Sequence, residues 1–283
     1  MKLIKKIAFF LLALACIGAA ALLFLPDTCP VRMGIMHMAG VPQHPSEPTP
    51  APDTPVQEET PLPVTVDDAE VEEWNTYHGD NALCGVAAGN FPDKFDVLWS
   101  VMAGAPVRVP PVVHQNIIVV VNSLSEIRAL KPDGTLLWKK EIRAPETGND
   151  AGREVRVDAP IAAAGGKIFL GTDMGDVAAL DILTGKALWW TSIGGAVLGT
   201  PNYTDDEKKV VVIDQDTGGL VCLDAVTGSQ VWKSTGADRS DASPAVYNNK
   251  AVYGSCASAV HVIDLASGTY LHDIAIHDGG GQI

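Results

Sequence analysis

The residues best suited to chemistry are few, and their spacing completes no familiar site. Asp214, Asp216 and Gly218 stand as in the first half of a calcium loop, but the later Glu is missing, so we interpret them as a polar β-turn. The cysteines form neither a Cys-x-x-Cys motif nor an adjacent pair, which argues against zinc or a redox motif. None of the seven histidines lies in a recognisable motif with a Ser or Cys nucleophile. We therefore predict no catalytic, cofactor-binding or metal-binding residues, and we expect a protein that is not an enzyme.

What the sequence repeats is a tight turn followed by a tryptophan. Residues 179–189 and 222–232 superpose without a gap: an apolar pair, Asp, a Thr-Gly turn, and Trp at the end. A shorter copy covers residues 129–138, and in residues 262–272 His272 replaces the Trp. Gly supplies the positive φ that such a turn between two strands requires. The signature residues, which we expect to be structural, are Trp99, Trp138, Trp189, Trp232, Gly134, Gly185, Gly228, Gly268, Asp181, Asp224 and Asp264.

A proline keeps the same period. It follows Trp99, Trp189 and Trp232 by twelve residues each, and it follows Trp138 by twenty-two because of a polar insertion around residues 145–156. The insertion is typical of a surface loop. A period of about 40 residues, filled with short Val/Ile/Thr-rich runs rather than helical periodicity, is typical of four-stranded β-propeller blades.

These repeats resemble the PQQ-like β-propeller family, which is named after the quinoprotein alcohol dehydrogenases and includes many non-catalytic envelope proteins. Residues 179–189 and 222–232 carry the resemblance, together with the entry motif Trp74–Asp80, and it covers about residues 74–283. It implies an all-β propeller in which each Trp packs between its own blade and a neighbour. The catalytic members bind a quinone and calcium with a vicinal disulfide, a stacking Trp and Glu, Asn and Asp ligands. No adjacent Cys pair exists here and no such ligand set can be placed, so we expect no cofactor.

The number of repeats predicts an incomplete ring. About four repeats are present, where the family usually closes a ring with about seven or eight. The next proline would fall just beyond Ile283, where the sequence stops. We expect a truncated product or gene fragment, ahead of closure against another copy of the chain.

The first 73 residues predict export and a tether. Lys2, Lys5 and Lys6 precede an apolar run over residues 7–25, so residues 1–26 are interpreted as a transmembrane helix with the bulk of the chain outside. A cleaved signal and a lipoprotein modified at Cys16 are the alternatives. Residues 27–73 are rich in proline and acidic residues, which predicts a disordered linker. The predicted location is the bacterial cytoplasmic membrane, single-pass, with the propeller domain (residues 74–283) on the periplasmic side.

Charge and two further residue types add expectations. The formal net charge of −14 argues against nucleic acid as a partner. Cys222 takes the place of Ala in its sister repeats, which predicts a buried thiol, and a bridge to Cys256 in the next blade is left open. Trp190, on the strand face opposite Trp189, is expected to be exposed or interfacial.

Together these features predict a membrane-tethered, non-catalytic propeller that binds envelope proteins, with oligomerisation possible. The alternative is a fragment of a PQQ-dependent dehydrogenase.

Overall fold

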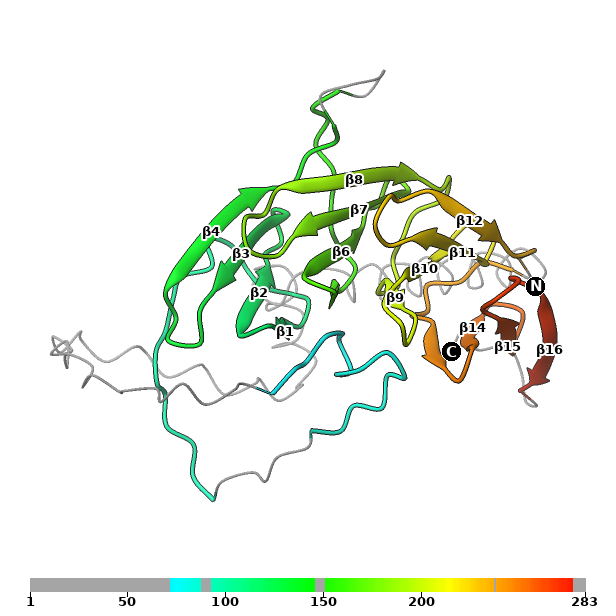
Figure 1. Ribbon diagram of the computed structural model, residues 1–283, viewed down its shortest axis with the longest axis horizontal. Helices are drawn as coiled ribbons and strands as arrows, with labels where there is room; N and C mark the ends of the chain where they lie inside the picture. Colours follow the sequence, from blue (N-terminus) through cyan, green and yellow to red (C-terminus); the bar gives the residue numbers. More distant parts are fainter. Residues whose placement is uncertain (1–71, 88–92, 146–150, 237, 277–283) are drawn as a thin grey trace, which may run out of the picture. The chain divides into compact units, whose positions relative to one another are not determined.

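The computed structural model describes residues 72–87, 93–145, 151–236 and 238–276, and this part of the chain is built from β-strands (Figure 1). In this described part, sixteen strands form four antiparallel sheets of four strands each, in the order inner to outer along the chain. Blade 1 comprises β1 (Val112–His114), β2 (Ile117–Val121), β3 (Glu126–Leu130) and β4 (Leu136–Glu141). Blade 2 comprises β5 (Ala162–Ala164), β6 (Lys167–Gly171), β7 (Asp176–Asp181) and β8 (Ala187–Ser192). Blade 3 comprises β9 (Asn202–Tyr203), β10 (Lys209–Asp214), β11 (Gly219–Asp224) and β12 (Gln230–Lys233), and blade 4 comprises β13 (Ala245–Tyr247), β14 (Lys250–Ser255), β15 (Ala259–Asp264) and β16 (Tyr270–Ala275). The predicted all-β blade architecture is confirmed.

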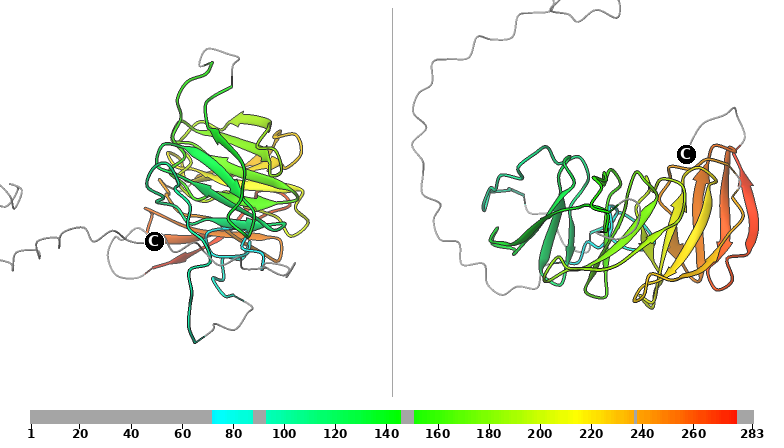
Figure 2. Two further views of the ribbon diagram at one scale, coloured as in Figure 1. Left: turned by 90° about the vertical axis from the view of Figure 1, so that its left-hand side faces the viewer. Right: turned by 90° about the horizontal axis from the view of Figure 1, so that it is seen from above.

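The four sheets stand side by side along an arc, with β1, β5, β9 and β13 on its inner side (Figures 1 and 2). Each blade is a meander, because short turns join neighbouring antiparallel strands. All four blades share one irregularity: the register between the third and fourth strands shifts by one residue next to the repeated turn. That bulge directs the large fourth-strand residue towards the following blade.

The core lies between blades, not within them. One apolar cluster joins blades 1 and 2, a second joins blades 2 and 3, and a third joins blades 3 and 4. Strands of the middle blades are therefore buried on both faces and read as continuous apolar runs, as Val210–Ile213 does. Each sheet is stable only against its neighbours, as in other repeat architectures.

Two expectations about single residues have outcomes here. Trp190, expected to be exposed or interfacial, is interfacial: it is half-buried and packs against the cluster between blades 1 and 2, because blade 1 covers that face of β8. Cys222 is buried, as predicted, and burial raises its pKa to about 11. The possible bridge to Cys256 is wrong: both thiols are free, and Cys256 lies exposed in the turn after β14.

None of the described residues forms a helix long and apolar enough to cross a bilayer. The expected anchor (residues 1–26) and almost all of the expected linker (residues 27–73) lie outside the described residues.

Candidate functional site

The repeated tryptophans form joints between consecutive blades. The ring of Trp189 (β8) lies over Gly228 of blade 3, so closely that a Cβ added to that glycine would stand 2.6 Å from the ring. Its indole N–H donates to the carbonyl of Ala225 at 3.2 Å. Trp138 and Trp232 make the same pair of contacts with the turns at Gly185 and Gly268 of the next blade, and Trp99, which precedes blade 1, makes them with the turn at Gly134. The glycines have φ between 67° and 82°, so both backbone conformation and space demand glycine.

The repeated aspartates fix the shape of those turns. Asp224 accepts hydrogen bonds from the backbone N–H of Thr227 (2.8 Å) and from its hydroxyl (2.9 Å). These bonds lower the pKa of Asp224. Asp181 and Asp264 bind Thr184 and Ser267 in the same way. The carboxylates are thus turn constituents rather than ligands.

A second repeated position was not predicted from the sequence. Each blade has a buried polar residue at or just after the end of its second strand, which accepts backbone N–H bonds from the following turn; these residues are Asn122, Thr172, Asp214 and Ser255. The signal was present in the aligned repeats as a polar residue following each apolar strand. Asp214, the first residue of the predicted polar β-turn, also binds Lys233 at 2.6 Å. Burial raises the pKa of Asp214, but the bond to Lys233 outweighs it and the net shift is downward.

In blade 4 this position belongs to a hydrogen-bonded relay that the sequence did not reveal. The Ser255 hydroxyl lies 2.6 Å from His261 Nε2, and His261 Nδ1 contacts Asp273. Because the carboxylate can only accept, His261 donates from Nδ1, and its Nε2 is left to pair with the serine hydroxyl. Nucleophile, base and carboxylate stand in hydrolase order. However, Ser255 and His261 are at most 1% exposed, so the relay ties β14, β15 and β16 together without access to a substrate.

Residues 73–81, here called the clasp, cross the inner strands of all four blades (cyan in Figure 1). Trp74 pairs with Val113 of β1 through two backbone bonds of 2.8 Å, and the carbonyl of Asn75 accepts from Ala163 of β5 at 2.8 Å. The carbonyl of Asn81 accepts from Val246 of β13 and from the side chain of Asn202 in β9, both at 2.7 Å. These donors face the centre of the arc, where a ligand held by the inner strands would need them. The clasp already occupies them.

The clasp is fixed at its start by a charged contact. Glu73 lies 2.6 Å from His114 Nδ1 and accepts from the N–H of Gln115 at 2.8 Å. His114 Nε2 in turn accepts from the N–H of Gly166 in blade 2, at 3.2 Å. Tyr203 lies buried nearby, and burial raises its pKa to about 12.

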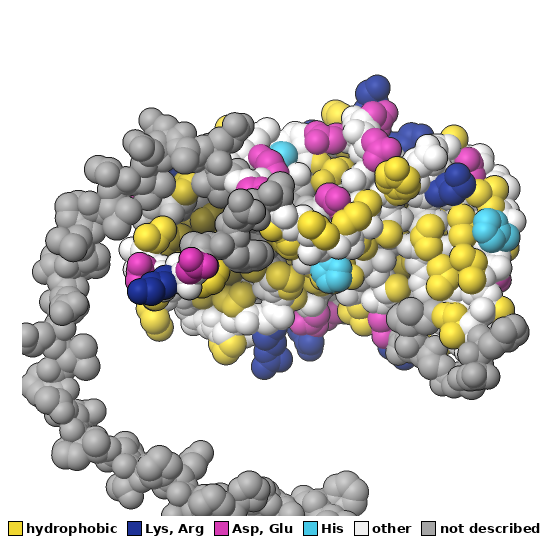
Figure 3. All heavy atoms as spheres, turned by 90° about the horizontal axis from the view of Figure 1, so that it is seen from below, with side chains coloured by type: hydrophobic (Ala, Val, Ile, Leu, Met, Phe, Trp, Pro, Cys, Tyr) yellow, Lys and Arg dark blue, Asp and Glu magenta, His cyan; other side chains and the backbone are white. Residues whose placement is uncertain are grey.

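Apolar side chains are exposed at both ends of the arc. At the first end, residues 93–107, here called the lead-in segment, carry Phe95, Val97 and Met102, which are 73–86% exposed. Trp99 holds this segment on Gly134, and the carbonyls of Met102 and Ala103 accept from Arg128 and Asn122. At the other end, Tyr247, Leu271, Ile274 and Ile276 of blade 4 are exposed. Figure 3 shows hydrophobic side chains gathered at this right-hand end.

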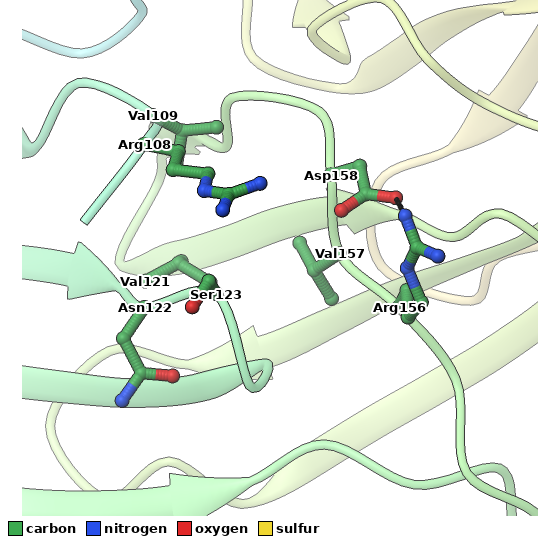
Figure 4. A pocket seen from close by; sticks show the side chains of 8 residues that line it. All are labelled: Arg108, Val109, Val121, Asn122, Ser123, Arg156, Val157 and Asp158. Atoms are coloured by element: carbon green, nitrogen blue, oxygen red, sulfur yellow. Dashed lines mark hydrogen bonds and ion pairs between the residues drawn. The ribbon is translucent and has the colours of Figure 1, made fainter. Parts of the chain in front are cut away.

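A cavity of about 640 Å³ opens where the connections into β1 and β5 pass the end of β2 (Figure 4). Two arginines, Arg108 and Arg156, lie on its rim. For metals, the described part of the chain contains no cluster of three or more His, Cys, Asp or Glu side chains placed to hold an ion.

Comparison with known proteins agrees with the blade repeat. The model of a family described as outer membrane protein assembly factor BamB matches residues 123–282. The protein of that name from Shewanella oneidensis is 30% identical over 158 residues, which cover 53% of this chain and 38% of that protein. The one from Xanthomonas campestris is 28% identical over 171 residues, covering 60% of this chain and 40% of that protein. The matched part of the chain thus spans about two fifths of these relatives' own lengths.

Among solved structures, a quinohemoprotein alcohol dehydrogenase from Pseudomonas putida superposes with a TM-score of 0.54 over 72% of this chain and 40% of its own. At 17% identity this likeness shows the shared fold alone.

Proposed function

The chain belongs to the PQQ-like repeat family described as outer membrane protein assembly factor BamB, and from this membership we propose that it is a non-catalytic protein-interaction module of the bacterial envelope. The related proteins carry the name of outer membrane assembly factors. For this chain we propose the general role, a rigid set of blades that holds envelope proteins through its exposed surfaces.

The observation that carries the proposal is the contrast between buried joints and exposed ends. Between blades, apolar residues are almost fully buried, whereas Met102 and Val97 at one end are each 86% exposed and Ile274 at the other is 54% exposed. Large contiguous patches of exposed apolar side chains are rare on soluble proteins and often mark protein-binding surfaces. Because the lead-in segment is held on blade 1 by Trp99, Arg128 and Asn122, it offers this surface in a fixed shape.

We further propose that residues 1–26 place the blades outside the cytoplasm and that residues 27–73 serve as the tether. The lysines before the apolar run support that orientation. The intact mass of the protein recovered from membranes distinguishes the three routes: an unmodified full chain for a retained anchor, a shortened chain for a cleaved signal, and a chain starting at Cys16 with added acyl mass for a lipoprotein. A cytoplasmic full chain that washes off membranes would contradict all three.

The interaction role is tested by site-specific photocrosslinking of the full chain in cells. A photoreactive residue at Met102 or Ile274 should yield defined adducts with envelope proteins. Leu183 and Val226, equally apolar and exposed but on turns of the middle blades, are the matched controls. Adducts of equal yield at all four positions, or none at the ends, would contradict the proposal.

The dehydrogenase alternative has a direct assay. Addition of pyrroloquinoline quinone and Ca²⁺ to the purified chain should neither produce alcohol-dependent dye reduction nor raise the unfolding midpoint. A ligand-dependent rise in that midpoint would favour the alternative.

A further inference from the structure

The cavity beside blades 1 and 2 has the volume of a ligand site. Its volume of about 640 Å³ lies within the range of about 300–1,000 Å³ typical of small-molecule pockets. Its walls come from three separate stretches, residues 108–109, 121–123 and 156–158, which are brought together by the packing of blade 1 on blade 2.

The rim is cationic on an otherwise acidic chain. The Arg156 guanidinium binds Asp158 at 2.5 Å, and Figure 4 shows Arg108 on the other side of the opening. Among the described carboxylates, none forms an ion pair with Arg108. A guanidinium is a planar fork that can bind a carboxylate through two parallel hydrogen bonds, and Arg156 already binds the carboxylate of Asp158 through one hydrogen bond.

The floor is apolar. Val121 and Val157 are almost completely buried, and Val109 is half-buried beside them. An inorganic anion would satisfy the arginines but leave the accessible part of Val109 in contact with water. The cavity therefore suits a ligand that carries its negative charge next to an apolar group.

Hydrogen bonds hold the walls in place. Val157 N–H donates to the buried Ser125 hydroxyl at 2.9 Å, and the backbone of Arg156 exchanges bonds of 2.9 and 3.0 Å with Asp173 of blade 2. On the opposite wall, Asn122 donates to the carbonyl of Ala103 at 2.8 Å. A site fixed in this way loses little conformational entropy when it binds.

We propose that this cavity binds a carboxylate attached to an apolar group, with Arg108 and Arg156 on the carboxylate and Val109 on the apolar part. Asp158 occupies the position of the ligand's carboxylate when the cavity is free and is displaced from Arg156 on binding. Two sources share this chemistry: a peptide that ends in an apolar residue, and a short fatty acid. The proposal does not depend on the interaction role of the arc's ends.

The test is a ligand-observed NMR titration of the full chain in non-ionic detergent. The probes are N-acetyl-leucine, which represents a peptide C-terminus, its neutral amide, and hexanoate. We expect at least one carboxylate to bind and the amide to bind at least about tenfold more weakly. Arg108→Gln and Arg156→Gln should each weaken binding about tenfold or more, whereas Arg143→Gln, an exposed arginine paired with Glu141, should leave it unchanged.

Asp158→Asn gives a result that simple loss of structure cannot give. It removes the internal competitor for Arg156, so carboxylate binding should tighten. Selective binding of N-acetyl-leucine would point to a peptide source and of hexanoate to a fatty acid. If neither carboxylate binds, if the amide binds equally well, or if Arg108→Gln with an unchanged circular dichroism spectrum binds as tightly as the original chain, the proposal is overturned.

Discussion

Blades 3 and 4 have the same fold but differ at two consecutive residues of the fourth strand. Trp232 on β12 lies over Gly268 of the next blade, whereas its counterpart on β16, His272, is exposed and contacts no such turn among the described residues. One residue further along, Lys233 pairs with buried Asp214 in blade 3, whereas Asp273 binds His261 and, through it, Ser255 in blade 4.

The difference shows that the repeat signature belongs to pairs of blades. A Trp contributes only when the turn of a following blade lies under its ring, so its energetic role is set by its neighbour and not by its own sheet. The next residue along the fourth strand, Lys233 or Asp273, is constrained differently. It must bind the buried polar residue at the end of the second strand, through an ion pair in blade 3 and through a histidine in blade 4.

The largest effect is expected from removing an enclosed ring. Trp189→Ala should lower the free energy of unfolding by about 3–5 kcal/mol, because it leaves a cavity between blades 2 and 3 and an unpaired carbonyl at Ala225. Urea denaturation of the full chain, followed by circular dichroism, measures it. His272→Ala is the matched control and should change the midpoint very little. Equal losses for the two variants would contradict the pairwise account of the signature.

The second prediction tests the ion pair between Lys233 and Asp214, which blade 4 lacks. Lys233→Met should cost about 3 kcal/mol near neutral pH, because Asp214 is left buried, charged and without its cation. The loss should shrink as pH falls, since protonation removes the unpaired charge. Adding Asp214→Asn, which keeps the acceptor for the turn, should restore much of the stability. A double variant no more stable than Lys233→Met would show that the charge is not the cause.

The sequence predicted the features that lie within one short segment. It did not predict contacts that depend on strand register or that join residues far apart in the chain. The turn, the Gly and the Trp lie within eleven residues, so their spacing revealed strands and blades directly. Ser255, His261 and Asp273 lie on three strands and meet only through the pairing of β15 with β14 and β16. The clasp contains the motif Trp74–Asp80, but its contacts reach up to 165 residues away, from Asn81 to Val246, and no local pattern predicts those partners. Trp190 shows the same limit: strand alternation gave its face, but only the packing of blade 1 covers it.

The third effect concerns the glycine beneath the ring. Gly228→Ala should cost roughly 2–4 kcal/mol, because φ is +73° and the new Cβ would overlap the Trp189 ring. Gly85, with φ +66° and no atom nearer than 3.7 Å, bears only the conformational part of that cost. The difference in unfolding midpoint between Gly228→Ala and Gly85→Ala therefore measures the joint itself. Similar losses would mean that backbone strain, not ring contact, dominates.

The smallest effect should be the same in both blades. Backbone and hydroxyl bonds from Thr227 lower the pKa of Asp224, and the Ser267 hydroxyl and N–H lower that of Asp264. A carboxyl whose pKa is lower in the folded chain stabilises it above the unfolded pKa, and this contribution is lost as pH falls through the folded value, below about pH 4. Asp224→Asn and Asp264→Asn should thus each flatten the acid limb of the stability profile slightly and by similar amounts, measured as urea midpoints between pH 7 and pH 3. Because these turns are alike in blades 3 and 4, a strong difference between the two variants would place the distinction between the blades in the turns rather than in the residues of β12 and β16.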